Sequence, residues 1–265
     1  MSDTFEGKIC IVTGGTSGIG MAISKALLGR GAVVYMVGIP EESVEAARGE
    51  LAGQENARFA AVDVTKYDEV QGIVDRAVEE NGRLDYMFNN AGIGGTGPFE
   101  LVTLDHWKTI IDINLWGVIY GVHAAFPVMV KQGSGHIVNT ASIAGVIAPP
   151  YQALYCATKF GVVGMTESLR YEHAWRGISF TSICPYNVAT PIFGDTEPPE
   201  DSITPEEAAE YSLAAVERKE GVVVLPDSAR DKWMPLRCDQ EALDKELFAM
   251  ADERRESMEK TGRYY

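Results

Sequence analysis

Short apolar runs that alternate with longer amphipathic segments constrain the fold of this chain more than any other feature. Each run is apolar throughout, without alternating polar residues, and this predicts strands that are covered on both faces. Strands that alternate with helices favour right-handed crossover connections. We therefore expect an α/β fold, a doubly wound, Rossmann-like parallel sheet in a single domain. The predicted strands are Lys8–Thr13, Ala32–Val37, Arg58–Val62, Leu84–Phe88, His136–Asn139, Ile178–Cys184 and Gly221–Leu225, and the predicted helices include Met21–Gly29, Glu41–Leu51, Tyr67–Asn81 and Leu104–Lys131.

The 265 residues divide into a main body and a charged tail. Residues 1–226 fit one α/β domain, and residues 227–265 are expected to form a helical C-terminal extension of it. Glycine, prolines and acidic residues between 193 and 204 predict a mobile loop. A helix then starts at Thr204-Pro205-Glu206-Glu207, which supplies a cap, a proline and early acids. The tail residues that share one face of a predicted amphipathic helix are Ala242, Leu243, Leu247 and Met250.

The formal charge of −15 argues against several classes of partner. Nucleic-acid affinity depends on Lys and Arg that neutralise phosphates, and an anionic membrane surface would repel this chain. We expect no apolar stretch of the roughly 18 residues that a membrane helix needs, and no secretory signal. Four cysteines without a C-x-x-C pair and four histidines without ligand spacing predict reduced thiols and no metal site. These features predict a cytoplasmic protein.

A glycine-rich turn, Thr13-Gly14-Gly15-Thr16-Ser17-Gly18-Ile19-Gly20, follows the first predicted strand and opens the first predicted helix. Glycines permit a tight turn and let the backbone approach a pyrophosphate, whose charge is stabilised at a helix N-terminus. Such a turn can also be purely structural. Its place between a strand and a helix favours dinucleotide binding.

Two more segments follow predicted strands. The small residues of Asn89-Asn90-Ala91-Gly92 would let a cofactor lie over the sheet edge, although an ordinary turn explains them equally well. In Asp63-Val64 the carboxylate could accept a hydrogen bond from an adenine amino group.

Ser142, Tyr155 and Lys159 carry the candidate chemistry. Residues four apart lie on one face of a helix, so the Lys159 ammonium is expected beside the Tyr155 phenol. That charge would favour the phenolate and lower the pKa of Tyr155 towards a value useful for a general base. Ser142 could hydrogen-bond a substrate oxygen. Taken alone, Tyr-x-x-x-Lys is common by chance and is more often an ordinary exposed pair.

Together these motifs resemble the short-chain dehydrogenase/reductase family over about Gly7 to Phe193, in the family's order and with its spacing from Ser142 to Tyr155. The resemblance implies an NAD(P)-dependent oxidoreductase that interconverts a secondary alcohol and a ketone. It also implies that Asn114 bends a helix and holds a water that links Lys159 to solvent. Pro185-Tyr-Asn-Val-Ala-Thr190 matches the family's Pro-Gly-x-Val-x-Thr. Here Tyr186 replaces glycine, which puts the local backbone in doubt and could bring a phenol into the pocket.

The resemblance assigns roles residue by residue. The catalytic residues it implies are Asn114, Ser142, Tyr155 and Lys159, and the substrate-binding residues are Ser142, Tyr155 and Tyr186. The cofactor-binding residues it implies are Gly14, Thr16, Ser17, Gly18, Ile19, Gly20, Gly38, Asp63, Val64, Asn90, Ala91, Gly92, Tyr155, Lys159, Pro185, Val188 and Thr190. The implied mechanism has Tyr155 remove the alcohol proton while hydride leaves for the nicotinamide, with Lys159 orienting the ribose.

The sequence also bears on the choice of dinucleotide, the class of substrate and the oligomeric state. The end of the second predicted strand offers neither a clear ribose-binding acid nor a base for a 2′-phosphate, and Glu41 and Glu42 favour NAD over NADP. A mostly apolar set of analogous pocket residues, within the segments 94–95, 143–152 and 186–193, favours a bulky steroid-like or aromatic substrate, although ordinary core residues around a small pocket remain the alternative. The family is commonly a homodimer or homotetramer through the helices around Asn114 and Tyr155.

Two alternative functions stay open, and so does the role of the tail. A relative that uses bound cofactor for epimerisation or dehydration is usually longer than this chain. A catalytically silent dinucleotide-binding sensor or scaffold would not need Ser142, Tyr155, Lys159 and Asn114 intact. The tail replaces the family's usual Asp-Gly-Gly ending and could cover the substrate pocket, join a neighbouring subunit or be solvated.

Overall fold

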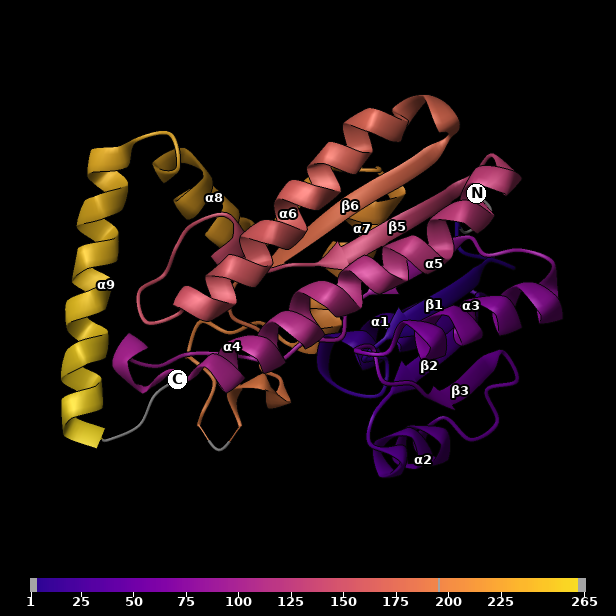
Figure 1. Ribbon diagram of the computed structural model, residues 1–265, viewed down its shortest axis with the longest axis horizontal. Coiled ribbons are helices and arrows are strands. Elements are labelled where there is room, and N and C mark those ends of the chain that lie inside the picture. The colour runs from indigo at the N-terminus through magenta and orange to yellow at the C-terminus, as the bar shows by residue number, and fades with distance from the viewer. Residues whose placement is uncertain (1–3, 195, 262–265) are drawn as a thin grey trace.

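A computed structural model describes residues 4–194 and 196–261 of the chain. Its centre is a seven-stranded parallel sheet in the order β3-β2-β1-β4-β5-β6-β7 (Figure 1). The order reverses between β1 and β4, where a doubly wound sheet opens a crevice at its carboxyl edge. Every predicted strand is confirmed, because runs this apolar are stable only where helices cover both faces. The strands are β1 (Ile9–Thr13), β2 (Val33–Gly38), β3 (Ala57–Ala61), β4 (Tyr86–Asn89), β5 (Gly135–Thr140), β6 (Ile178–Pro185) and β7 (Val222–Leu225).

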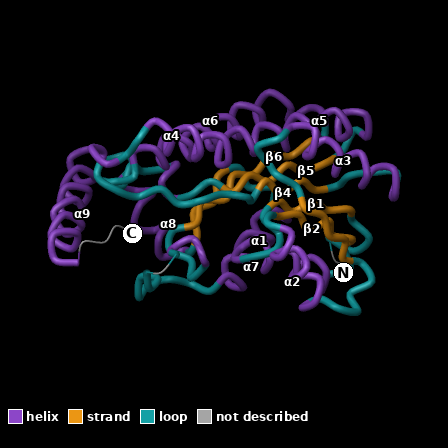
Figure 2. The backbone as a smooth tube through the Cα atoms, turned by 60° about the horizontal axis from the view of Figure 1, so that its bottom comes forward, coloured by secondary structure: helices purple, strands orange, loops and turns teal. Residues whose placement is uncertain are grey.

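Helices cover the two faces of the sheet (Figure 2). On one face lie α3, α5 and α6, and on the other lie α1, α2 and α7. Apolar side chains of both layers meet the strands, so that each face has its own buried cluster. The α-helices are α1 (Gly18–Gly29), α2 (Glu41–Glu50), α3 (Tyr67–Asn81), α4 (Leu104–Ile111), α5 (Gly117–Gln132), α6 (Ala153–His173), α7 (Pro205–Glu217), α8 (Asp227–Leu236) and α9 (Gln240–Thr261).

The segment predicted as one helix, Leu104–Lys131, contains a π-helical turn at Asp112–Trp116 that separates α4 from α5. As one continuous helical segment, Leu104–Gln132 is long and apolar enough by length and composition to cross a membrane, so the expectation of no such stretch was wrong. Core helices pass the same test. This segment packs against β4, β5 and α3, and 44% of its most apolar window is buried.

The start of α7 is confirmed in detail. The Thr204 hydroxyl accepts from the Glu207 backbone N–H at 3.1 Å, and the Glu207 carboxylate accepts from the Thr204 backbone N–H at 2.8 Å. This capping box satisfies two donors that the first turn of a helix leaves free. The capping box therefore defines where the predicted loop ends and α7 begins. Residue 195 of that loop lies outside the described residues.

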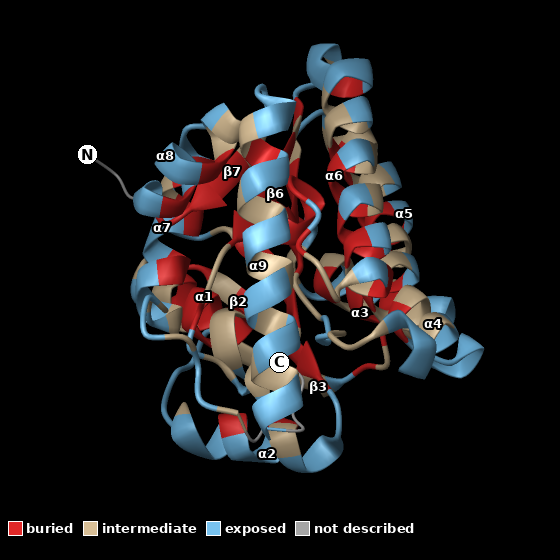
Figure 3. Ribbon diagram, turned by 90° about the vertical axis from the view of Figure 1, so that its left-hand side faces the viewer, coloured by how far each residue is buried: buried red, intermediate tan, exposed pale blue. Residues whose placement is uncertain are grey.

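The tail forms two helices, α8 and α9, and α9 crosses the carboxyl ends of the strands (Figure 3). The predicted apolar face holds: Leu243 is buried, and Leu247 and Met250 pack against a cluster that contains Ile147 and Trp233. Among the described tail residues, α9 is therefore packed onto the domain and not free in solvent. Residues 262–265 lie outside the description.

Candidate active site

The glycine-rich turn between β1 and α1 packs tightly against the loops after β4 and β6. A Cβ atom at Gly14, whose φ is +62°, would lie 3.0 Å from the Ala91 Cα atom. A Cβ atom at Gly20 would lie 2.1 Å from the carbonyl oxygen of Gly14, and one at Gly18 would lie 3.2 Å from the Thr190 Cγ2 atom. The structure thus brings three segments of the predicted cofactor site together, and only glycine permits these approaches.

A hydroxyl that the sequence analysis did not single out fixes this junction. The Thr13 Oγ1 atom accepts from the backbone N–H groups of Asn90 at 2.9 Å and Ala91 at 3.0 Å. The Asn90 side chain donates to the Thr13 carbonyl at 3.2 Å and accepts from the Thr140 hydroxyl at 3.2 Å. Thr13 belongs to the glycine motif as it stands in the sequence, but its partners lie 77 residues away or more, so only the fold reveals this role.

The N-terminus of α1 fits a pyrophosphate. Ser17 occupies the cap position in an extended conformation, its side chain makes no capping hydrogen bond, and the first turn carries no acidic residue. The first N–H groups of a helix need acceptors, and anions bind there readily. With an uncapped N-terminus and no acidic residue in the first turn, the residues present fit a dinucleotide.

The remaining predicted cofactor-binding residues, Gly38, Asp63 and Val64, lie at or just after the ends of β2 and β3. A Cβ atom at Gly38 would lie 2.4 Å from the Thr16 hydroxyl, which hydrogen-bonds the Ser43 hydroxyl at 2.8 Å. Burial works to raise the pKa of Asp63, but the hydrogen bonds from Thr65 and the charge of Lys66 outweigh it and lower the pKa. Asp63 is thus a carboxylate at neutral pH, with one oxygen already accepting from Thr65. Val64 is buried against Gly117.

Ser142, Tyr155 and Lys159 lie together at the carboxyl ends of β5 and β6. The Ser142 hydroxyl accepts from the Ala144 backbone N–H at 3.2 Å, and it lies close enough to the Tyr155 phenol to influence its pKa. The Lys159 ammonium donates to the Thr140 carbonyl at 3.0 Å and lies 5.4 Å from the centroid of the Tyr155 ring. The sequence-predicted triad is therefore assembled on one helix face and one strand end.

The expected lowering of the Tyr155 pKa was wrong. Burial raises the pKa of Tyr155 to about 12, although the hydrogen bond with Ser142 works in the other direction. Burial also lowers the pKa of Lys159 to about 8. Spacing alone predicted the charge beside the phenol, but desolvation of the charged forms dominates both groups. At neutral pH the phenol carries its proton.

Asn114 is fully buried within the π-helical turn and holds the loop after β4. Its side-chain oxygen accepts from the Ile93 backbone N–H at 2.8 Å, and its side-chain nitrogen donates to the Ile93 carbonyl at 2.9 Å. A Cβ atom at Gly92 would lie 3.2 Å from the Asn114 oxygen and 3.6 Å from the Lys159 nitrogen. The helix thus carries a π-helical turn at Asn114, and Gly92 lies between the Asn114 and Lys159 side chains; the water that the resemblance implies stays a prediction.

The segment Pro185–Thr190 keeps its place although Tyr186 replaces glycine. The Tyr186 backbone N–H donates to Leu225 at 2.9 Å, and its φ is not positive, so the local backbone is ordinary. The phenol ring lies 6.3 Å from the Trp233 ring of α8. Tyr186 therefore packs towards the tail, and a contact with substrate stays a prediction. Val188 is buried, and the Ser142 hydroxyl donates to the Pro185 carbonyl at 3.5 Å.

Comparisons with known proteins agree with this arrangement. The family described as short chain dehydrogenase matches residues 8–201. An uncharacterized oxidoreductase of Staphylococcus saprophyticus is 33% identical over 83% of this chain and 95% of its own length. The D-threitol dehydrogenase of Mycolicibacterium smegmatis is 38% identical over 71% of this chain and 72% of its own length.

A solved structure is similar throughout. It is a short chain dehydrogenase/reductase from Burkholderia phymatum in complex with NAD, with a TM-score of 0.81 and 24% identity, and it covers 93% of this chain and 97% of that one. At this identity the likeness shows the fold alone.

Proposed function

The chain belongs to the short chain dehydrogenase family, and from this premise we propose that it interconverts a secondary alcohol and a ketone with a nicotinamide dinucleotide. One observation carries the proposal: Ser142, Tyr155 and Lys159 lie together at the sheet edge that also holds the uncapped start of α1. A protein that only bound a dinucleotide would need the second feature but not the first.

The dinucleotide supplies the hydride acceptor or donor when it is bound. The glycines at 14, 18 and 20 and the N-terminus of α1 would hold its pyrophosphate. In reduction, the Tyr155 phenol, protonated at neutral pH, donates its proton to the ketone oxygen. In oxidation, Tyr155 must first lose this proton, and the resulting phenolate takes the alcohol proton. Ser142 orients the substrate oxygen. The Thr140 carbonyl accepts a hydrogen bond from the Lys159 ammonium and holds it beside the Tyr155 ring.

NAD is the cofactor that we propose. The first turn of α2, directly after β2, carries Glu41 and Glu42 and has no basic residue. Two exposed carboxylates beside the β2 end raise the energy of a 2′-phosphate placed there. The similar Burkholderia protein was solved with NAD.

Two substrate classes compete. Exposed Ile93 and Ile192 border the catalytic edge, and α9 closes it with apolar Leu247 and Met250, which supports a bulky apolar substrate of steroid-like or aromatic kind. The name of the Mycolicibacterium relative supports a short polyol instead. We propose the bulky class, because α9 lies outside the part of the chain that the family match covers, and its inner face is apolar.

The test is hydride transfer followed at the absorbance of the reduced nicotinamide, with NAD and NADP in parallel and a panel of steroid, aryl and tetritol alcohols. We expect turnover with NAD on steroid or aryl alcohols. Turnover on D-threitol alone contradicts the bulky class, preference for NADP contradicts the cofactor proposal, and tight NAD binding without turnover on any alcohol or ketone opposes the enzyme itself.

A further inference from the structure

A cavity of about 320 Å³ opens at the end of the sheet opposite the catalytic residues. In Figure 1 this is where α6 turns back into β6, far from α9. The end of α6 contributes Arg170 and Tyr171, the start of β6 contributes Ser179 and Phe180, and the turn between α7 and β7 contributes Lys219. Its volume lies within the range of small-molecule sites, roughly 300–1,000 Å³.

The charges of this cavity are unusual for a chain of net charge −15. Both charged residues that line it, Arg170 and Lys219, are cations, and among the described residues neither has a carboxylate within 4.0 Å. Two carboxylates close to Lys219 in the sequence pair with other cations: Glu220 with Arg218, and Glu217 with Arg30. Two cations that line one cavity without a paired carboxylate favour the binding of an anion there.

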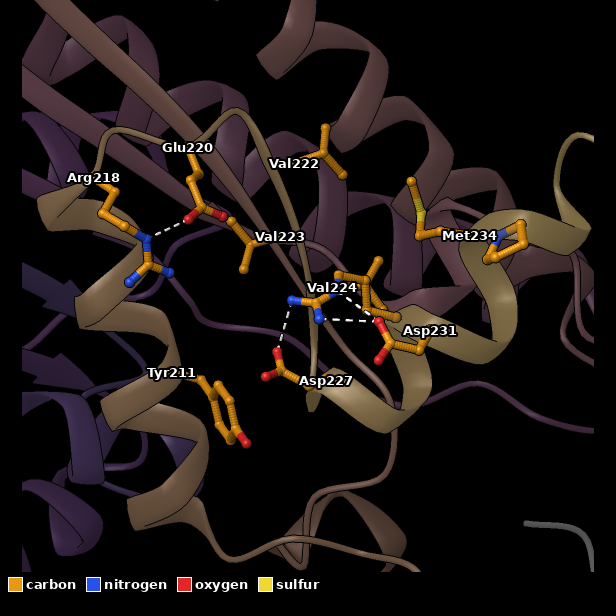
Figure 4. A pocket seen from close by; sticks show the side chains of 11 residues that line it. Tyr211, Arg218, Glu220, Val222, Val223, Val224, Asp227, Asp231 and Met234 are labelled. Atoms are coloured by element: carbon orange, nitrogen blue, oxygen red, sulfur yellow. Dashed lines mark hydrogen bonds and ion pairs between the residues drawn. The ribbon is translucent and has the colours of Figure 1, made fainter.

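A second cavity provides the contrast. It has about 330 Å³ and lies at the free edge of β7 between α7 and α8 (Figure 4). Its cations are neutralised within the cavity: Arg230 pairs with Asp227 and Asp231, and Arg218 pairs with Glu220. In this second cavity, unlike the first, both lining cations have a carboxylate partner.

The backbone next to the two cations is unusual at two positions. The Arg170 guanidinium lies against Gly221, where a Cβ atom would be 3.0 Å from its Nε atom and 3.1 Å from its Cζ atom. Lys219 has a φ of +55°, a left-handed conformation that costs energy for a lysine. His136, whose pKa burial and the Lys219 charge lower to about 3, is neutral and adds no charge of its own.

We propose that this cavity binds a small organic anion with a flat apolar group, an aryl phosphate or an aryl carboxylate. Arg170 and Lys219 bind the anionic oxygens, because a guanidinium and an ammonium form strong, charge-assisted hydrogen bonds with them. The Tyr171 ring, 69% exposed, contacts the flat group, and the Ser179 hydroxyl adds a donor. This site is separate from the catalytic edge and does not depend on the proposed function.

The experiment is calorimetric titration of the full chain, saturated with NAD, with phenyl phosphate, benzoate and inorganic phosphate. We expect one site that weakens at least roughly tenfold in the double variant Arg170→Gln/Lys219→Gln, because two charge-assisted contacts are lost. The double variant Lys108→Gln/Lys245→Gln, which removes two exposed lysines elsewhere, is the matched control and should bind as the wild type does. Comparison of phenyl phosphate with benzoate identifies the preferred anion.

A separate variant tests the contact between the Tyr171 ring and the apolar group of the ligand. Tyr171→Ala should lower the affinity for phenyl phosphate to that for inorganic phosphate and leave the latter unchanged. Equal binding by the wild type and the Arg170→Gln/Lys219→Gln variant, equal loss in the control, or displacement of the anion by NAD would each overturn the proposal. Far-ultraviolet circular dichroism establishes that all variants are folded.

Discussion

Replacement of Lys159 by methionine is expected to abolish hydride transfer and yet leave the folded protein at least as stable at neutral pH. The side chain is 3% exposed, and burial lowers its pKa from 10.5 to about 8. A difference of about 2.5 pH units corresponds to about 3 kcal/mol of destabilisation when the ammonium is charged in the folded state. Methionine fills the same space without a charge.

The lost hydrogen bond offsets part of that gain. Lys159 donates to the Thr140 carbonyl at 3.0 Å, and an unpaired buried acceptor costs about 1–3 kcal/mol. We therefore expect Lys159→Met to be more stable than the wild type by between about 0 and 2 kcal/mol at pH 7.

The pH dependence gives the sharper test. Between pH 8 and 10.5 the unfolded chain binds a proton at Lys159 that the folded chain has released, so the stability of the wild type rises with pH across this window. Urea unfolding of both proteins from pH 7 to 10.5 should show the wild type gaining about 3 kcal/mol relative to the variant. Parallel stability curves, or a variant several kcal/mol less stable at pH 7, would refute the reasoning.

Three other changes have defined outcomes. Gly20→Ala places a methyl group 2.1 Å from the Gly14 carbonyl and should weaken NADH binding at least roughly tenfold by fluorescence titration, whereas Gly29→Ala, with nothing within 4 Å, should leave it unchanged. Thr204→Ala removes the cap of α7 and should lower the urea-derived free energy of unfolding by about 1 kcal/mol; an unchanged value contradicts the capping argument. Arg254→Met removes the 2.6 Å hydrogen bond from α9 to the Pro150 carbonyl and should speed limited proteolysis within α9; an unchanged rate would mean that this bond does not hold the helix.

The strands and the site segments were readable from the sequence for one physical reason. In a parallel sheet, apolar runs mark the strands, and the polar and glycine residues that follow them converge at the carboxyl edge. Ser142 and Tyr155 meet there, as do Gly14 and Ala91. The resemblance to a known family supplied Asn114, which has no local signal of its own.

The features that could not be predicted from the sequence depend on contacts between residues that are far apart in the chain. The apolar periodicity of residues 104–131 gives no sign of the π-helical turn at Asn114. The Asn114 side chain in this turn hydrogen-bonds Ile93, 21 residues away, and only the fold reveals that contact. The spacing of Tyr155 and Lys159 predicted attraction between their charges, whereas burial, which needs the fold, sets both pKa values. The tail was expected to be helical with a final amphipathic helix, and it forms α8 and α9; the anchor of α9 on Pro150, 104 residues away, was not predicted.

The central claim is that Tyr155 transfers the proton at this site, and Tyr155→Phe tests it most directly. In single-turnover measurements with saturating NAD and the best alcohol of the panel, the variant should lose hydride transfer by about 10²–10⁴-fold. Its affinity for NAD should stay within about twofold of the wild type, because the glycine turn that binds the pyrophosphate is untouched. Hydride transfer at the wild-type rate in Tyr155→Phe would contradict the account.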